Sequence, residues 1–364
     1  MNEKKLMNAW VLHDVNSFTY EDRVKPEPEA GWVLVRVKAA GICGSDIPRA
    51  FTTGAHKKNL VIGHEFSGCV EAVGADVDVD WIGKKVGIFP LIPCRKCGPC
   101  SQGRYEMCRN YNYLGSRCDG GFADYVAAPV ANLIEIPENV TYEQAAMLEP
   151  MAVAVHAMRR GLELIGESRD GAVSNAEMKI AVCGLGTIGL LLVMFLRQKG
   201  FRNIYVIGNK ASQKKHIDTL GISEEYFCDS REHNITEWLA EHAGGVDMFY
   251  ECVGKNETVA CAVDSLNPAG ALVLVGNPYS DMSLEKAVYW KILRNQLKLT
   301  GTWNSSFTGD KDDDWHYVIN CLEQGLVAPE KMISHRYEMK ELMEGFLIMR
   351  DKTEDYVKIM GVND

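Results

Sequence analysis

The sequence predicts an α/β protein of two domains, one of them built on a doubly wound parallel sheet. The chain has 364 residues, which is too long for one ordinary hydrophobic core. From about residue 178 to residue 300, strand-like apolar runs alternate with helical stretches, as in a parallel sheet covered by helices. A largely polar stretch, 163–177, precedes this region and is expected to be the connector between the domains.

The parallel sheet is expected to begin with a strand that leads directly into a glycine-rich turn. Residues 178–196 form a strand pattern, then G-x-G-x-x-G from Gly184 to Gly189, then an apolar helical run. Such glycines are a weak signal alone, but between a strand and a helix they mark a Rossmann dinucleotide site. They let the backbone approach a pyrophosphate, whose charge the helix N-terminus favours. The uncharged run 180–196 is shorter than the roughly 20 residues of a membrane-spanning helix.

Further strands are expected at 203–207, 246–253 and 271–275. An acid that binds the ribose 2′-hydroxyl of NAD is expected about 20 residues after the fingerprint. Here the acid is missing and lysines follow, which favours NADP over NAD unless the lysines only cover a solvated helix start. The expected cofactor-binding residues are Gly184, Gly186, Thr187, Ile188, Gly189, Gly208, Asn209, Lys210, Val253, Val275 and Gly276.

Four cysteines within fifteen residues predict a closed metal site. Cys94, Cys97, Cys100 and Cys108 follow the pattern C-x2-C-x2-C-x7-C. Closely spaced thiolates on a folded-back loop bind zinc tetrahedrally, and four of them leave no open position, so the site is expected to be structural. Disulfides are a poor alternative at this spacing. An iron–sulfur cluster is the serious rival, but the closing spacing and the absence of a proline after Cys108 weaken it.

A sparser set of metal-binding residue types lies around the four cysteines in the sequence. Cys43, the pair His64 and Glu65, and Glu149 are separated along the chain, and each is a weak signal alone. Together they offer a thiolate, an imidazole and two carboxylates. Three such ligands with an open position are the pattern of a catalytic zinc.

The composition excludes several classes of function. The net charge of −10 argues against nucleic acid or anionic lipid as a partner. Residues 1–9 are polar and lack the apolar core of a signal peptide. Twelve cysteines without a secretion signal indicate a reducing compartment, so a cytoplasmic protein is expected.

In their order and spacing these motifs resemble the zinc-dependent medium-chain dehydrogenases, the group of alcohol, sorbitol and threonine dehydrogenases. The resemblance is carried by Cys43–Asp46, Gly63–Glu65, Cys94–Cys108, Glu149–Pro150 and Gly184–Gly189. Within the group it is strongest to the galactitol-1-phosphate 5-dehydrogenases, through Gly44–Phe51, Leu114–Arg117, Asp119–Ala123 and Gly301–Ser305.

The resemblance implies a GroES-like β-barrel catalytic domain over 1–160, with a structural zinc lobe at about 90–112. A Rossmann domain would follow over 161–300, and residues 301–364 would return to the catalytic domain. Residues 355–360 alternate enough to be a closing strand. The group also implies a homo-oligomer, either a dimer or a tetramer.

The resemblance assigns the catalytic zinc to Cys43, His64 and a carboxylate, which is Glu65, Glu149 or each in turn. Adjacent strand residues point to opposite faces, so His64 and Glu65 can share an ion only if the chain turns at Gly63. Ser45 would be the hydroxyl on the substrate side that carries the proton. The expected substrate-site residues are Ser45, His56, Arg117 and Asn304.

The implied reaction is hydride transfer between NAD(P) and a secondary alcohol of a polyol or polyol phosphate resembling galactitol 1-phosphate. A phosphate would need cations, for which Arg49, Lys57, Lys58 and Arg117 are candidates. The alternatives are a dehydrogenase of the sorbitol or threonine type, a zinc- and dinucleotide-binding sensor without turnover, and an iron–sulfur carrier.

Overall fold

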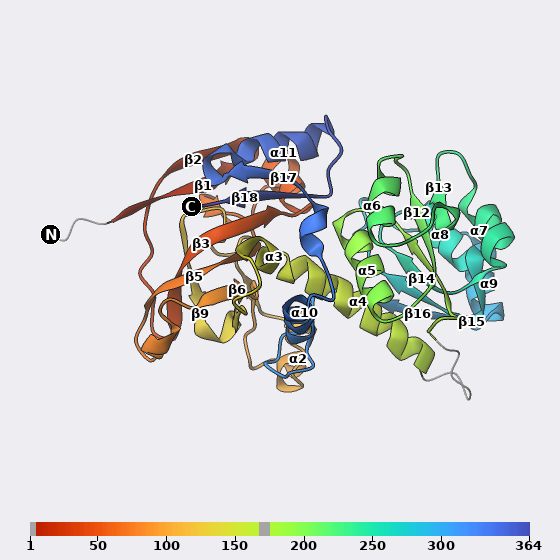
Figure 1. Cartoon of the computed structure of the whole chain (residues 1–364), viewed down its shortest axis with the longest axis horizontal. Coiled ribbons are helices and arrows are strands. Elements are labelled where there is room, and N and C mark those ends of the chain that lie inside the picture. The colour runs from red at the N-terminus through yellow and green to blue at the C-terminus, as the bar shows by residue number, and fades with distance from the viewer. Residues whose placement is uncertain (1–4, 167–174) are drawn as a thin grey trace. The chain divides into compact units, whose positions relative to one another are not determined.

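The computed structural model describes residues 5–166 and 175–364, which divide into two compact units (Figure 1). Unit 1 comprises Met1–Ala152 and Ser305–Asp364, and unit 2 comprises Val153–Asn304. Of the predicted polar start and connector, residues 1–4 and 167–174 lie outside the described residues. The first part of the predicted connector is helical, because α4 (Leu148–Gly166) continues through Gly166.

Unit 1 is rich in β-structure, arranged in three sheets. The largest has the order β10-β6-β5-β3-β18-β17, with β9 also paired to β3. Its strands are β3 (Trp32–Ile42), β5 (Glu65–Val73), β6 (Lys85–Ile88), β9 (Tyr125–Pro129), β10 (Leu133–Glu135), β17 (Ile333–Glu338) and β18 (Lys358–Val362). The second sheet joins β2 (Ser17–Val24), β1 (Leu6–Asp14) and β4 (Leu60–Val61), and the third pairs β7 (Leu91–Ile92) with β8 (Asn112–Tyr113).

The closing strand predicted near the C-terminus is present as β18, although it begins at Lys358. In Figure 1 this blue strand lies beside the red–orange β3, with which it pairs antiparallel. The register places Ile359 opposite Ile42, so Lys358 lies next to the end of β3, where Cys43 follows. The last strand of the chain therefore brings a charged side chain to the first predicted metal ligand.

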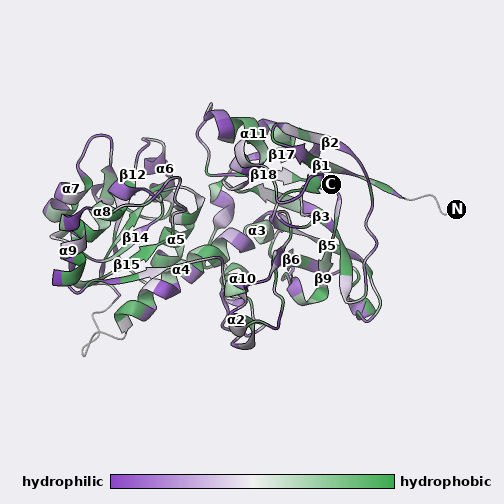
Figure 2. Cartoon of the chain, turned by 180° about the vertical axis from the view of Figure 1, so that it is seen from behind, coloured by the Kyte–Doolittle hydropathy of each residue, from purple (hydrophilic) through white to green (hydrophobic). Residues whose placement is uncertain are grey.

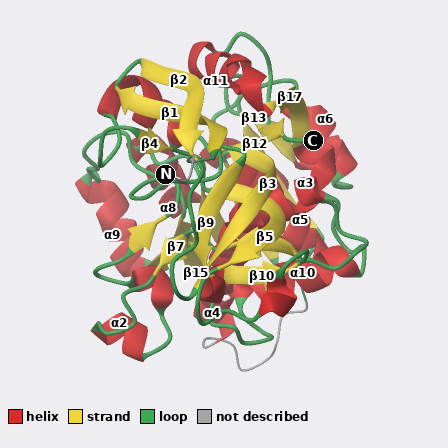
Figure 3. Cartoon of the chain, turned by 90° about the vertical axis from the view of Figure 1, so that its left-hand side faces the viewer, coloured by secondary structure: helices red, strands yellow, loops and turns green. Residues whose placement is uncertain are grey.

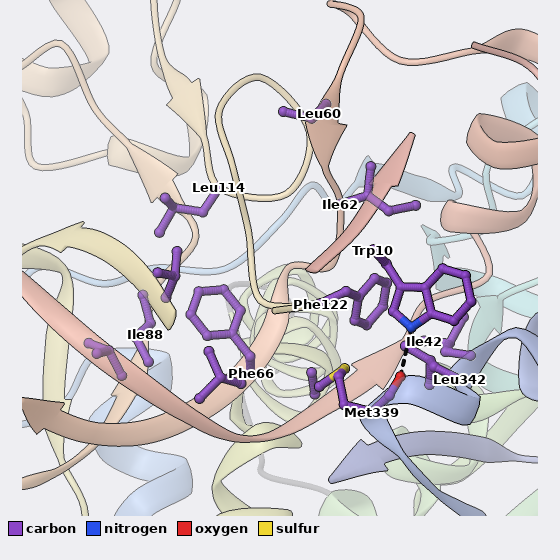
Figure 4. Close-up of a cluster of buried hydrophobic side chains, with 14 of the residues drawn as sticks. Trp10, Ile42, Leu60, Ile62, Phe66, Ile88, Leu114, Phe122, Met339 and Leu342 are labelled. Atoms are coloured by element: carbon purple, nitrogen blue, oxygen red, sulfur yellow. Dashed lines mark hydrogen bonds between the residues drawn. The ribbon is translucent and has the colours of Figure 1, made fainter. Parts of the chain in front are cut away.

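The core of unit 1 combines residues from both ends of the chain (Figure 4). Trp10, Phe66 and Phe122 pack with Met339 and Leu342, and all five are at most 6% exposed. The Trp10 indole N–H, which burial would otherwise leave unpaired, donates to the Met339 carbonyl at 2.6 Å. Burial of these large side chains holds the C-terminal segment onto the N-terminal strands.

The helices of unit 1 are short, and of these Figure 3 shows α3 and α11 near its strands. They are α1 (Asp46–Pro48), α2 (Gly98–Ser101), α3 (Tyr142–Ala146), the start of α4, α10 (Asp314–Glu323) and α11 (Leu342–Asp351). α3 packs on β3 and β5, and α11 packs on β17 and β18. Thr141 and Gln144 form a capping box that fixes where α3 begins.

Unit 2 is a six-stranded parallel sheet of order β13-β12-β11-β14-β15-β16. Numbered within the sheet this is 3-2-1-4-5-6, the Rossmann order, so the predicted doubly wound sheet is confirmed. The strands are β11 (Lys179–Cys183), β12 (Asn203–Gly208), β13 (Phe227–Asp229), β14 (Val246–Glu251), β15 (Leu266–Leu274) and β16 (Lys298–Gly301). Its helices are the rest of α4, α5 (Thr187–Gln198), α6 (Gln213–Thr219), α7 (Ile235–Ala243), α8 (Asn256–Ser265) and α9 (Lys286–Arg294).

The predicted strand, turn and helix of the glycine fingerprint appear as β11, Gly184–Gly186 and α5. α5 is buried from Gly189 to Leu196, which explains why its sequence carries no charge before Arg197, whereas α9 mixes hydrophobic and hydrophilic residues (Figure 2). Within the described residues, no helix has the length and apolar character needed to cross a membrane.

Candidate metal centres and dinucleotide site

The lobe from Cys94 to Cys108 brings its four sulfur atoms within 4.8 Å of one another. It is the connection between β7 and β8, which pair antiparallel at its base. Backbone N–H groups of Cys94 and Asn110 donate to Cys108 Sγ at 3.2 and 3.5 Å. Such donors stabilise a thiolate, and those of Arg109 and Cys100 lower the pKa of Cys97 to about 6. All twelve cysteines are free thiols, and the four of the lobe fit a tetrahedral zinc ion.

The second cluster consists of Cys43, His64 and Glu65, whose ligand atoms also lie within 4.8 Å of one another. Cys43 follows β3, and Glu65 opens β5, which pairs with β3 by setting Gly41 opposite Glu65. Gly63 has φ = 97°, so the chain turns before His64. The side chains of His64 and Glu65 can therefore both reach the Cys43 thiol. A Cβ on Gly63 would lie 2.7 Å from the Phe122 ring, so only glycine fits there.

Asp46 contacts two of the three residues of the cluster, Cys43 and His64. Its fully buried carboxylate accepts from the Cys43 N–H at 3.1 Å and lies 3.6 Å from His64 Nδ1. Burial acts to lower the pKa of His64, but Asp46 and Cys43 raise it well above its ordinary value. A carboxylate beside a metal-ligating imidazole fixes the orientation of the ring. Arg49 donates to Asp46 at 2.5 Å, so this candidate phosphate ligand already has an anionic partner.

Lys358 also belongs to this cluster, and the sequence did not reveal it. Lys358 is 2% exposed, and its ammonium group donates to Glu65 Oε2 at 2.5 Å and to the Ile42 carbonyl at 3.1 Å. Burial opposes the charge, yet Glu65 and Cys43 raise the pKa of Lys358 above its ordinary value. Lys358 thus offsets one of the negative charges that a divalent cation would otherwise have to balance alone.

Glu149 lies near this cluster but outside the group of three. Its carboxylate Oε1 accepts from the Tyr113 hydroxyl at 3.3 Å. The pKa of Glu149 is raised to about 7, because burial, with a smaller contribution from Glu65, outweighs the lowering by His64 and Lys358. The cluster therefore has two carboxylates in different situations: Glu65, paired with an ammonium group, and Glu149, paired with a phenol.

The other predicted substrate residues lie in varied settings. Ser45 is at the cluster, with its hydroxyl 3.3 Å from Cys43 Sγ. His56 is exposed on the loop before β4, and Arg117 is exposed with its guanidinium 4.3 Å from the centre of the Tyr111 ring. Asn304 belongs to unit 2, where its backbone is left-handed with φ = 58°.

The ends of the parallel strands in unit 2 have little room for side chains. Gly184 has φ = 99°, and a Cβ there would lie 2.8 Å from Val253. A Cβ on Gly189 would lie 1.9 Å from the Gly184 carbonyl oxygen, and one on Gly276 would lie 2.3 Å from the Gly254 nitrogen. This close approach of β11, α5, β14 and β15 is what a dinucleotide cradle requires.

Two side chains that the sequence did not single out shape this cradle. Glu251 is buried and accepts from the N–H groups of Val253 and Gly254, which holds the turn after β14. Gln213 accepts from the N–H groups of Asn209 and Lys210 at 2.9 and 3.1 Å. A Cβ on Gly208 would lie 2.2 Å from Gln213 Oε1, so an acid at this position would displace Gln213.

Comparisons with known proteins identify the family of the chain. Residues 29–138 match the alcohol dehydrogenase GroES-like domain, and residues 142–359 match the glucose dehydrogenase C-terminus. The galactitol 1-phosphate 5-dehydrogenase of Escherichia coli K12 is 30% identical over 306 residues, which cover 84% of this chain and 85% of that protein.

Two solved structures share the fold over nearly the whole chain. A zinc-binding dehydrogenase from Sinorhizobium meliloti, bound to NADP, has a TM-score of 0.85 at 25% identity and covers 99% of this chain and 100% of its own. The RspB alcohol dehydrogenase from Escherichia coli CFT073, complexed with NADH, has a TM-score of 0.87 at 26% identity, covering 98% and 99%. The chain therefore belongs to the zinc-dependent medium-chain dehydrogenases, as an oxidoreductase that acts on an alcohol group with zinc and NAD(P).

Proposed function

We propose that this protein catalyses the reversible oxidation of a secondary alcohol of a polyol or polyol phosphate resembling galactitol 1-phosphate. The observation that carries the proposal is the cluster of Cys43, His64 and Glu65, with the Ser45 hydroxyl beside it. Three ligands of these types leave a position for a substrate oxygen. The E. coli relative that acts on galactitol 1-phosphate supports the choice of substrate class.

The roles of the side chains follow from their contacts. A zinc ion at this cluster would acidify the substrate hydroxyl, and NAD(P) would accept the hydride that leaves the carbon. Ser45 receives the hydroxyl proton and passes it toward solvent. Asp46 keeps the His64 ring in place through the 3.6 Å contact with Nδ1. Lys358 holds the Glu65 carboxylate in position through its hydrogen bond to Oε2.

For the cofactor we propose a preference for NADP, bound within residues 161–300. Supporting this, no acid follows β12, where Gly208, Asn209 and Lys210 stand instead. The S. meliloti structure contains NADP, whereas the RspB structure contains NADH. Residues 1–160 and 301–364 would carry the substrate and both zinc ions.

For a phosphorylated substrate, two of the four candidate cations have competing partners. Arg49 pairs with Asp46, and Lys58 pairs with Asp14 at 2.6 Å. Lys57 and Arg117 are therefore the better candidates for a phosphate group. Sorbitol and threonine carry no phosphate, so a dehydrogenase of either type would not use these two cations for that purpose.

We also propose that the protein is a cytoplasmic homo-oligomer, either a dimer or a tetramer. The absence of disulfides among its twelve free cysteines supports a reducing compartment.

Among the described residues, β16 pairs only with β15 and so presents an open edge. Leu299 on this strand and Tyr289, Trp290 and Leu293 on α9 are 39–55% exposed. A second copy pairing with β16 would cover this edge and these side chains. Leu299→Arg is expected to halve the mass measured by sedimentation.

The test of function is a substrate panel with NAD and NADP, using polyols, polyol phosphates and amino alcohols. We expect the highest kcat/KM for a polyol phosphate with NADP, and about two zinc ions per chain. Lys57→Ala and Arg117→Ala should then raise KM for the phosphate and leave KM for the free polyol unchanged. Iron with visible absorbance, or no turnover of any alcohol, would refute the proposed function and favour an electron carrier or a sensor.

A further inference from the structure

Gln213 occupies the place of the acid that is missing from the dinucleotide site. It is the first residue of α6, and its side chain reaches back to the loop that follows β12. A Cβ on Gly208 would lie 2.2 Å from Gln213 Oε1, so the amide oxygen stands where an acidic side chain at 208 would begin. In Rossmann domains an acid at this place binds the ribose 2′-hydroxyl of NAD.

Three hydrogen bonds fix the amide of Gln213. Its Oε1 accepts from the consecutive N–H groups of Asn209 and Lys210 at 2.9 and 3.1 Å. Its Nε2 donates to the Leu185 carbonyl, between the first two glycines of the fingerprint, at 3.1 Å. Because the oxygen faces only donors and the nitrogen faces an acceptor, these partners define the orientation of the amide. The side chain therefore joins the loop after β12 to the glycine-rich turn.

The acid beside Gly208 in the sheet does not replace the missing one. Asp229 lies opposite Gly208 in the register of β12 and β13. Its two carboxylate oxygens accept from the guanidinium of Arg231 at 2.9 and 2.5 Å, and one of them also accepts from the Arg231 N–H at 3.0 Å. Asp229 is thus neutralised by a bidentate partner. The acceptor for the N–H groups of residues 209 and 210 is the uncharged side chain of Gln213.

These two N–H groups can bind an anion more strongly than they bind an amide. They belong to the loop between β12 and α6 and converge on one oxygen, an arrangement that favours negative charge. Hydrogen bonds to an ionised acceptor are roughly twice as strong as those to a neutral one. The 2′-phosphate of NADP can therefore take both N–H groups from Gln213. The 2′-hydroxyl of NAD is neutral and gains nothing by the exchange.

We propose that Gln213 helps to determine the cofactor preference by competing with the 2′-phosphate of NADP for the N–H groups of Asn209 and Lys210. Bound NADP displaces the amide oxygen, whereas bound NAD leaves it in place. This inference rests on the proposed preference for NADP. It moves part of the choice between the two cofactors from position 208, where there is no side chain, to a side chain on the following helix.

The test compares the binding of adenosine 2′,5′-bisphosphate and adenosine 5′-monophosphate to the full chain, measured by calorimetry without turnover. The two probes differ only in the 2′-phosphate. In Gln213→Ala two neutral hydrogen bonds no longer compete, so affinity for the bisphosphate should rise about 3- to 10-fold and affinity for the monophosphate should change less than about 2-fold. Gln213→Glu places a carboxylate at the N–H groups and should lower affinity for the bisphosphate by about 10- to 100-fold.

A second variant tests the same contact and leaves Gln213 in the chain. The backbone of Gly208 is not left-handed, so Gly208→Ala is tolerated there, and its Cβ would push the amide oxygen aside. Gly208→Ala should raise affinity for the bisphosphate as Gln213→Ala does, and it should add nothing in a Gln213→Ala background. Gln324→Glu is the matched control for the added charge, because Gln324 is exposed in unit 1, and it should leave both affinities unchanged.

The outcomes separate the two proposals. If Gln213→Ala and Gly208→Ala bind the bisphosphate no more tightly than the wild type, Gln213 does not compete with the phosphate. Equal losses for both probes in Gln213→Ala would also overturn the inference, since they would show only that the amide supports the loop. A wild type that binds the two probes equally would refute the preference for NADP. A gain for the bisphosphate in Gln213→Ala would still support the role of Gln213 in that case.

Discussion

The two cysteine-containing clusters of unit 1 are built in opposite ways. The lobe takes four thiols from fifteen consecutive residues, and it stabilises them through backbone N–H groups of the same loop. The Cys43 cluster draws one thiol, one imidazole and one carboxylate from the end of β3 and the start of β5, and Lys358 from a third strand, 293 residues beyond Glu65. The first is complete by itself, whereas the second depends on the whole fold of unit 1.

This difference fits the chemistry expected of each cluster. Four ligands of one kind saturate an ion and hold a loop together. A mixed set of three with charged neighbours leaves an open position, and each buried charge then needs its own partner. Asp46 has Arg49, Glu65 has Lys358 and Glu149 has Tyr113. The comparison implies that a substitution at the Cys43 cluster also disturbs the charged residues around it. A substitution in the lobe is expected to affect only the lobe.

The largest effect is expected from Cys43→Ser. Losing the thiolate removes the ion that acidifies the substrate hydroxyl, and metal binding shifts the pKa of a bound oxygen by many units. Turnover with the best substrate should fall by more than about 1000-fold. Metal analysis should find one zinc ion per chain, held by the lobe.

Cys69→Ser is the control for Cys43→Ser, because Cys69 is a partly buried thiol on β5 outside both groups. It should retain two zinc ions and normal turnover. Unchanged turnover in Cys43→Ser would contradict the catalytic role of the cluster.

Lys358→Met should have the next largest effect, because it leaves Glu65 buried without its cationic partner. Breaking a buried ion pair costs about 3–5 kcal/mol of unfolding free energy. Denaturant unfolding of the zinc-free protein measures this cost. Glu65→Gln combined with Lys358→Met should recover part of the loss, since neither charge then remains.

The matched control for Lys358→Met is Lys340→Met, whose ion pair with Glu338 is exposed on both sides. Exposed pairs contribute at most about 1 kcal/mol. Equal losses in the two variants would show that the buried pair has no special role in the cluster.

A smaller effect is expected from pH, through Glu149 in the zinc-free protein. Burial raises the pKa of Glu149 from 4.5 to about 7, so the folded chain holds this proton more tightly than the unfolded chain. The stabilisation is fully present below pH 4.5 and is lost as the pH rises through about 7. It amounts to about 3 kcal/mol at most, at 1.36 kcal/mol per pKa unit.

The measurement is the unfolding free energy of the zinc-free wild type between pH 4.5 and 8, minus that of Glu149→Gln. The difference isolates Glu149 from the other titrating groups. A difference that does not change with pH would mean that Glu149 is ionised in the folded chain throughout this range.

The smallest effect should come from a contact at the rim of the lobe. The Arg95 guanidinium lies 5.1 Å from the centre of the Tyr105 ring. Because Arg95 is exposed, Arg95→Ala should cost no more than about 1 kcal/mol and leave two zinc ions per chain. Loss of the lobe zinc in this variant would show that the lobe depends on its surroundings after all.

Local patterns in the sequence were enough for the features that form locally. The Rossmann order follows from alternating strands and helices together with the glycines from Gly184 to Gly189, which must accept close backbone contacts whatever the remaining fold. The spacing of Cys94 to Cys108 constrains the loop sufficiently to bring its sulfur atoms together. The closing strand was found, although its first residue was placed at 355 and not at Lys358.

The missed residues are those whose role depends on distant contacts. In the sequence, Lys358 looks like any charged residue of an alternating strand. Only the register of β18 against β3 places it beside Glu65. Tyr113 reads as one of several aromatic residues, and only the pairing of β8 with β7 aims it at Glu149. Asp46 lay within a recognised motif, yet nothing in its spacing indicated that it would lie beside His64.

The position of β18 between β3 and β17 has a consequence for biosynthesis. Lys358 leaves the ribosome 293 residues after Glu65, which at 5–20 residues per second is a delay of about 15–60 s. Throughout that time Cys43, His64 and Glu65 are present in the nascent chain without the ammonium group of Lys358. The four-cysteine lobe, in contrast, can bind its ion as soon as Cys108 emerges. The lobe should therefore bind its zinc ion first. The Cys43 cluster should bind the catalytic ion last, after Lys358 has been synthesised.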